Sequence, residues 1–113
     1  SLAYSKDKKI NLNNYKNLYI SHLYASDCTS FNVTKCKQLR YVYFYCVDKL
    51  TYVDLSKAKK LVGGDVCYCK RLTPAKIKKI KSAKFTTNKG RWYEATKPYS
   101  KLREPISAEM QKY

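Results

Sequence analysis

Acidic residues, glycine and histidine are all scarce in this sequence. It has 8 Asp or Glu residues against 24 Lys or Arg residues, and His22 is its one histidine. Hydrolytic carboxylate pairs need two acids held close together, and no nucleophile–His–acid spacing stands out around His22. Gly63 and Gly64 are adjacent but lack the G-x-x-x-x-G-K frame of a phosphate-binding loop. We therefore expect a protein that is not an enzyme and that carries no cofactor.

Long hydrophobic runs are also missing. The longest uninterrupted apolar run, residues 41–47, is far shorter than the roughly 20 residues that span a bilayer. No transmembrane segment is therefore predicted. The chain begins Ser-Leu-Ala-Tyr, with neither an initiating Met nor a signal peptide, and we interpret it as a piece of a longer protein.

The formal net charge is +16. A charge of this size attracts anions over long range, among them nucleic acids, acidic glycans, other anionic polymers and acidic proteins. The alternative is that the lysines serve solubility alone.

A nine-residue pattern recurs at a spacing of about 22 residues. It reads apolar, polar, apolar, two polar, one medium-sized residue, two polar, apolar. Self-similarity at such a spacing is typical of repeat proteins, in which each coil buries its apolar face against the next. The copies are Ile10–Leu18, Phe31–Leu39, Val53–Leu61 and, more weakly, Ala75–Ala83.

Each coil divides into two half-units with the frame apolar-x-x-apolar-x-apolar. The last two apolar residues of the frame are two apart, which places both on one face of a strand. β-branched and aromatic residues crowd these segments, as in Arg40–Cys46, and favour strands over helices. We expect a β-rich α/β protein, a short solenoid of about three coils with parallel strands. A helical stripe through Tyr15, Leu18 and His22 competes with this interpretation, and a small α+β domain is the alternative fold.

The fourth copy allows a second interpretation. Thr73 and Pro74 form a good helix start, with Thr as the N-cap and Pro at the first helical position. A basic capping helix at 74–84 would close the exposed end of the solenoid. We expect the repeat solenoid to occupy residues 7–83 and a C-terminal cap or tail to occupy residues 84–113.

The segment Leu50–Leu61 reads L-T-Y-V-D-L-S-K-A-K-K-L. It resembles the coils of leucine-rich repeat proteins, whose common signature is L-x-x-L-x-L-x-x-N/C-x-L. The most similar variant is the 21-residue repeat of internalin J-like and related bacterial surface adhesins, roughly L-x-x-L-D-V-S-x-N-x-x-L. Tyr15, Cys36, Ala58 and Ile80 replace the Asn of that frame, and Cys36 is an accepted alternative there. The resemblance implies a binding module at a cell surface.

The five cysteines cannot all pair within the chain, because their number is odd. Cys67 and Cys69 form C-x-C rather than the C-x-x-C of zinc and redox sites, so no metal site is expected. Cys46 and Cys67, on adjacent coils, would come near disulfide range in a secreted protein. In a cytosolic protein all five would be thiols, and both alternatives stay open.

Placing the copies in register turns single residues into ladders. Asn14 is followed at this spacing by three lysines, and Lys16 is followed by three more. Successive rungs should lie about 4.8 Å apart if the coils stack like parallel strands. Tyrosines that alternate outward along the strands form a further candidate surface. The predicted ligand-binding residues are Lys35, Lys37, Lys57, Lys59, Lys79, Lys81, Tyr41, Tyr43, Tyr45 and Tyr52.

We expect these residues to recognise a protein or an anionic glycan or polymer, at a cell surface or outside the cell. The alternative is a nucleic-acid-binding domain, intracellular or viral, which the basic charge with interleaved aromatic residues supports. Two structural explanations compete with both functions. The lysines would then be solvated turn residues, and the tyrosines would pack across strands. The sequence indicates no oligomeric state.

Overall fold

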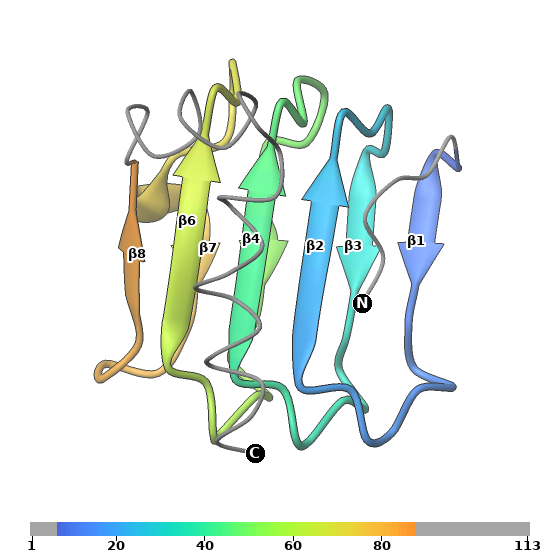
Figure 1. The fold of residues 1–113 in the computed structure, drawn as a ribbon, viewed down its shortest axis with the longest axis vertical. Coiled ribbons are helices and arrows are strands. Elements are labelled where there is room, and N and C mark those ends of the chain that lie inside the picture. Colours follow the sequence, from blue (N-terminus) through green and yellow to red (C-terminus); the bar gives the residue numbers. More distant parts are fainter. Residues whose placement is uncertain (1–6, 88–113) are drawn as a thin grey trace, which may run out of the picture.

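The computed structural model describes residues 7–87 of the chain. These residues wind into a β-solenoid of about four turns built from parallel strands (Figure 1). This confirms the β-rich solenoid expected from the repeat and adds one turn to the three expected. The strands are β1 (Lys9–Asn11), β2 (Ile20–Tyr24), β3 (Ser30–Asn32), β4 (Tyr41–Tyr45), β5 (Val53–Asp54), β6 (Gly63–Cys67), β7 (Ile77–Lys78) and β8 (Lys84–Thr86), and a single 3-10 turn, η1 (Pro74–Lys76), precedes β7.

One layer of the solenoid is a continuous parallel sheet in the order β2-β4-β6-β8. Ile20 lies opposite Tyr41, Tyr41 opposite Gly63, and Gly63 opposite Lys84. Each step along the sheet advances 21 or 22 residues. The spacing found in the sequence is therefore the length of one turn of the solenoid.

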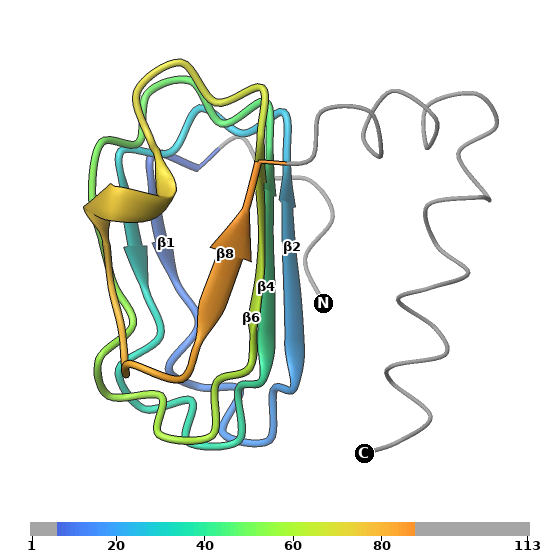
Figure 2. The ribbon, with the colours of Figure 1, turned by 90° about the vertical axis from the view of Figure 1, so that its left-hand side faces the viewer.

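The facing layer holds the odd-numbered strands, which run in the opposite direction to the even-numbered ones (Figure 1). Ile10 in β1 lies opposite Phe31 in β3, and Val53 in β5 lies opposite Ile77 in β7. The two pairs form separate two-stranded sheets, although β3 and β5 are in contact. Figure 2 shows the two layers edge-on.

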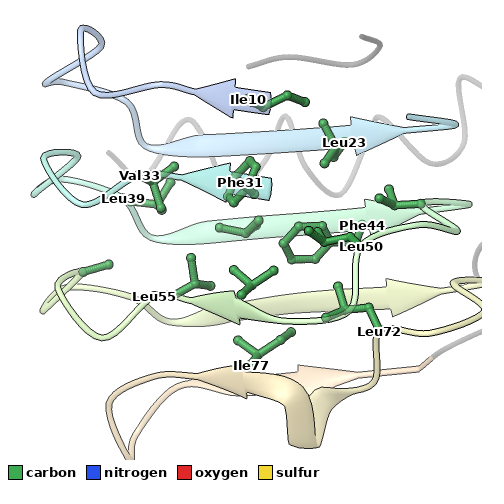
Figure 3. Close-up of a cluster of buried hydrophobic side chains, with 14 of the residues drawn as sticks. Ile10, Leu23, Phe31, Val33, Leu39, Phe44, Leu50, Leu55, Leu72 and Ile77 are labelled. Atoms are coloured by element: carbon green, nitrogen blue, oxygen red, sulfur yellow. The ribbon is translucent and has the colours of Figure 1, made fainter. Parts of the chain in front are cut away.

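The hydrophobic core fills the space between the two layers and runs through the whole stack (Figure 3). Alternation along each strand decides which residues enter it. In β4, Val42 and Phe44 enter the core and have no exposed surface, whereas the tyrosines of that strand belong to a second cluster. Phe44 packs edge-to-face on Phe31 of the opposite layer, with ring centroids 5.4 Å apart. Since no coil closes its own apolar face, this shared core holds the coils together.

The fourth copy of the repeat follows a different register from the one that the sequence suggested. Val53 lies opposite Ile77, not opposite Ala75, which is exposed. The two extra residues before Ile77 are accommodated by η1. The turn after Ile77 is two residues shorter than the turn after Val53. Ile80 therefore occupies the position equivalent to Ala58. The insertion and the deletion cancel, which explains why the overall spacing of 22 residues survives.

The structure contradicts the alternative interpretation of the fourth copy as a capping helix at 74–84. Thr73 has the extended conformation of an N-cap and Pro74 begins η1, but Thr73 makes no capping hydrogen bond with its side chain. The helix ends after one 3-10 turn, and β7 and β8 follow. The solenoid therefore continues through Thr86 rather than ending at residue 83. Residues 88–113 of the expected cap or tail lie outside the described residues.

Gly63 and Gly64 are an integral part of β6 rather than an interruption of the repeat. A Cβ on Gly63 would lie 1.8 Å from the carbonyl oxygen of Lys84, and one on Gly64 would lie 1.6 Å from that of Val42. Gly63 also has φ of +146°, which other residues rarely adopt. The ring of Phe85, opposite Gly64 in β8, lies against the side of β6 where Gly64 has no side chain.

Candidate functional site

One corner of the solenoid is cationic in every coil. It consists of the turns that lead from odd-numbered to even-numbered strands, residues 12–19, 33–40, 55–62 and 79–83, along the lower edge of Figure 1. These four segments contain no Asp or Glu. Their positive charges therefore share the corner without a carboxylate in the same turns. We call the exposed lysines of these turns the lysine corner: Lys16, Lys35, Lys37, Lys57, Lys59, Lys60 and Lys81.

Two successive tight turns shape each of the first three coils at this corner. In the second coil the N–H of Cys36 donates to the carbonyl of Val33 (2.9 Å), and the N–H of Leu39 donates to the carbonyl of Cys36 (3.2 Å). The same two bonds recur around Tyr15 and Ala58. These backbone hydrogen bonds form although Tyr15, Cys36 and Ala58, and not Asn, occupy this position of the leucine-rich repeat frame.

A side-chain hydrogen bond, which we did not predict, begins each of these turns. Oδ1 of Asp54 accepts from the N–H and the hydroxyl of Ser56 (2.9 and 2.6 Å). Asn32 accepts from Thr34 in the same way, and Asn11 accepts from the N–H two residues later. Asn or Asp followed two residues later by Asn, Thr or Ser is the sequence signal of such a turn.

These bonds also affect the charge of the turn. Hydrogen bonds from the hydroxyl and then the N–H of Ser56 lower the pKa of Asp54, and the charge of Lys78 adds a smaller lowering. Asp54 is therefore an anion at neutral pH. It lies at the end of β5, beside the lysine corner and outside its turns.

Polar contacts between coils fix the corner further. The N–H of Lys35 donates to Oδ1 of Asn13 in the preceding coil (2.8 Å). Nζ of Lys60 donates to Oε1 of Gln38 (2.9 Å), and the thiol of Cys36 donates to the carbonyl of Leu12 (Sγ to O 3.1 Å). The backbone that carries the lysines is thus held from coil to coil, while the lysine side chains are exposed.

The structure brings one predicted lysine ladder together in full and divides the other. Lys16, Lys37 and Lys59 each follow the residue between the two tight turns. Lys81 follows Ile80, which accepts from the N–H of Ala83 just as Ala58 accepts from that of Leu61 (both 3.2 Å). We call these four residues, Lys16, Lys37, Lys59 and Lys81, the lysine strip.

The second ladder holds only Lys35 and Lys57 in equivalent positions. The prediction that Lys79 is the fourth member of this ladder is wrong. Asp54 lies opposite Lys78, so Lys79 is level with Leu55 and not with Lys57. Lys79 is half-buried at a position that is apolar in the other coils.

The predicted tyrosines do not form one surface. Tyr41, Tyr43 and Tyr45 lie in β4, where neighbouring rings stack with centroids 6.3 and 6.2 Å apart. Tyr43 and Tyr45 are only 4% and 2% exposed, which corrects the expectation that their rings are open to a ligand. Tyr52 is 55% exposed but precedes β5 in the opposite layer. Tyr15, which we did not predict, is 60% exposed beside Lys16.

The opposite corner, which we call the mixed corner, is built differently. It comprises residues 25–29, 46–52 and 68–76, and it carries both acids and bases. Each of its turns begins with a non-glycine residue at positive φ: Ala25 (48°), Cys46 (56°) and Tyr68 (53°). Lys49 and Asp27 form an exposed ion pair across two coils (3.9 Å).

The mixed corner also contains an open hollow of about 480 Å³ lined by Cys46, Asp48, Tyr68, Cys69 and Lys70. All five cysteines of the chain are thiols. Cys67 lies opposite Tyr45, one residue out of register with Cys46. Burial raises the pKa of the Cys69 thiol to about 11, and burial also raises the pKa of Cys46. Both thiols are therefore protonated and weakly nucleophilic at neutral pH.

Among residues 7–87, no three His, Cys, Asp or Glu side chains are grouped so that they could hold a metal ion. Within the same residues, no helix has the length and hydrophobicity to cross a membrane. Comparisons with protein families, with curated proteins and with solved structures find no match to this chain.

Proposed function

We propose that this protein is a non-enzymatic binding module that holds an acidic polysaccharide at the lysine corner. The observation that carries the proposal is the recurrence of exposed lysines at equivalent positions of stacked turns that contain no acid. An acid-free row of cations maintains a local positive potential that attracts a linear polyanion. Solvated lysines used for solubility alone need no common position and no exclusion of acids.

Nucleic acid is the second candidate, and the arrangement of the aromatic residues favours it less. Surfaces for single strands combine cations with aromatic rings on which successive bases stack. At the lysine corner, Tyr15 and Tyr19 belong to the first coil, and the corner segments of the later coils contain no aromatic residue. Tyr43 and Tyr45 are buried in another part of the molecule. The cations and the stacking rings are therefore not interleaved in space.

The likeness of Leu50–Leu61 to the coils of bacterial surface leucine-rich repeat proteins adds support of a different kind. Such proteins use stacked coils as extended binding surfaces. A glycan ligand fits a location outside the cell or at its surface, which we propose for this protein. This step is an analogy between folds and has less force than the charge pattern.

The test is a comparison of two variants with equal loss of charge. In the first, Lys37, Lys59 and Lys81 are all replaced by Gln. In the second, Lys49, Lys70 and Lys76, which are exposed on the mixed corner, are replaced by Gln. Affinities for polygalacturonate, single-stranded DNA and duplex DNA are measured across a salt series. Thermal melting verifies that both variants fold.

The proposal predicts that the wild type binds polygalacturonate more tightly than either DNA at the same salt concentration. The corner variant should lose most of this affinity, and the control variant should keep most of it. Equal losses in the two variants would show that net charge alone drives binding. Tighter binding of single-stranded DNA with a steep salt dependence would replace the glycan with nucleic acid. No binding to any polymer at physiological salt would leave solubility as the role of the lysines.

A further inference from the structure

The lysine strip holds the exposed lysines of the cationic corner that recur in all four described coils. Lys16, Lys37 and Lys59 each follow the residue that closes the first tight turn, and Lys81 follows Ile80, whose carbonyl accepts from the N–H of Ala83. The other exposed lysines of the corner occur in some coils only. Parallel strands stack at about 4.8 Å, so the strip extends about 14 Å along the stacking axis.

We infer that the bound polyanion lies parallel to the stacking axis of the solenoid and places one acidic group on each coil. This inference rests on the proposed function and specifies how the ligand is held. A chain in this direction meets a cation at every coil. The number of coils, rather than the charge of any one turn, then sets how many acidic groups are bound.

The charges around a single coil do not favour a polyanion that follows one coil instead of the stacking axis. In the third coil Lys57, Lys59 and Lys60 are exposed, but Asp54 lies immediately before them at the end of β5. After them the chain enters β6, where Asp65 accepts a hydrogen bond from the hydroxyl of Thr86. A polyanion that followed the coil would therefore leave the cations within one turn and approach the exposed carboxylate of Asp54, whereas Asp65 is buried.

Repulsion within the strip provides a second argument. Two ammonium groups about 4.8 Å apart repel each other in water, and flexible side chains reduce this repulsion. Lys37 and Lys59 each have two neighbours in the strip, whereas Lys16 and Lys81 have one. An acidic group seated near each rung offsets this repulsion along the whole row. Binding should therefore raise the melting temperature of the folded protein.

The test uses galacturonic acid oligomers of defined length, which carry one carboxylate per sugar, with the full chain of 113 residues. Affinity should rise with each added sugar until the oligomer reaches the four rungs and should then level off. Each rung is replaced by Gln in turn, which at an exposed turn position changes stability little. Each variant should weaken the tetramer by about two- to fivefold, the effect measured for exposed ion pairs.

The trimer gives a positional signature that net charge cannot produce. Loss of an end rung, Lys16 or Lys81, leaves three consecutive lysines, so trimer affinity should stay near the wild-type value. Loss of Lys37 or Lys59 leaves at most two consecutive lysines, and the trimer should bind more weakly. Equal trimer affinity in all four variants would overturn the axial arrangement while the proposed function stands. An effect confined to Lys59 would show that the ligand follows the third coil, and no binding of any oligomer to the wild type would overturn the proposed function itself.

Discussion

The turns at the two corners of this solenoid differ in backbone geometry and in charge. At the lysine corner each of the first three coils makes the same pair of tight turns, and only cations and neutral residues occupy the turn segments. At the mixed corner the turns lengthen along the stack, from 25–29 to 46–52 to 68–76, and each begins in the left-handed region. Uniform backbone geometry and uniform charge therefore occur together on one side of the molecule.

This difference makes it possible to distinguish the contribution of the core to stability from the contribution of one corner to binding. Both corners are attached to the same core, because Leu39 at the lysine corner and Leu50 at the mixed corner have no exposed surface. What differs is the surface that each corner presents to solvent. Variants at matched positions of the two corners can therefore show which properties belong to the shared core and which to one corner.

The largest effect on stability is expected from substitutions that create a cavity in the core at each corner. Leu39→Ala and Leu50→Ala each remove a fully buried side chain and should lower the free energy of unfolding by about 2–5 kcal/mol. Denaturant unfolding measures both. Since Leu39 ends the second tight turn with its side chain buried in the core, the cavity should loosen that turn, and Leu39→Ala should in addition weaken polygalacturonate binding by the folded protein. Weakening by Leu50→Ala to the same degree would show that the two corners do not act separately.

A smaller effect is expected where the lysine corner begins. Asp54→Ala removes the acceptor for the N–H and hydroxyl of Ser56 and should cost about 1 kcal/mol. Asp54→Asn is the matched control, because Asn11 and Asn32 occupy the equivalent positions in the first two coils. It should keep the turn, and its stability at neutral pH should stay close to that of the wild type.

Asp54 also makes the stability of the corner depend on pH. Because folding lowers the pKa of Asp54, its carboxylate contributes stability above the pKa of the unfolded chain, and this contribution is lost as the pH falls through the lower, folded value. Asp54→Asn should remove this acid-side loss, as measured by unfolding at a series of acidic pH values. An identical acid-side profile in the wild type and Asp54→Asn would mean that other carboxylates account for it.

Periodicity predicted the architecture because it reflects the core directly. Val42 and Phe44 alternate as strand residues must, so the spacing of their equivalents equals the length of one turn. The register at Ile77 could not be predicted in this way. An insertion at η1 and a deletion after β7 cancel in the overall spacing, and only the strand pairing shows them.

Of the predicted site residues, the lysines of the strip were placed correctly and the tyrosines of β4 were not, for a related reason. The lysines of the strip were found because turn positions stay exposed whatever packs elsewhere. The tyrosines of β4 were assigned to the outer face, but alternation shows which face a side chain occupies and not whether that face is covered. Tyr43 and Tyr45 are accordingly buried although they point away from the solenoid core. The Asn and Asp residues that begin the turns were overlooked, although their spacing from Asn, Thr or Ser is a readable signal.

The smallest effect is expected from the left-handed residues of the mixed corner. Ala25 is exposed, has φ of 48°, and its N–H donates to the carbonyl of Tyr45 (2.8 Å). A non-glycine residue in this region costs about 1–2 kcal/mol, and the greater freedom of Gly in the unfolded chain offsets about half of that. Ala25→Gly should therefore stabilise the protein by up to about 1 kcal/mol, measured by denaturant unfolding. Asn14→Gly at the lysine corner, where φ is not positive, should instead lower stability, and a gain there as large as that at Ala25 would remove the distinction between the two corners.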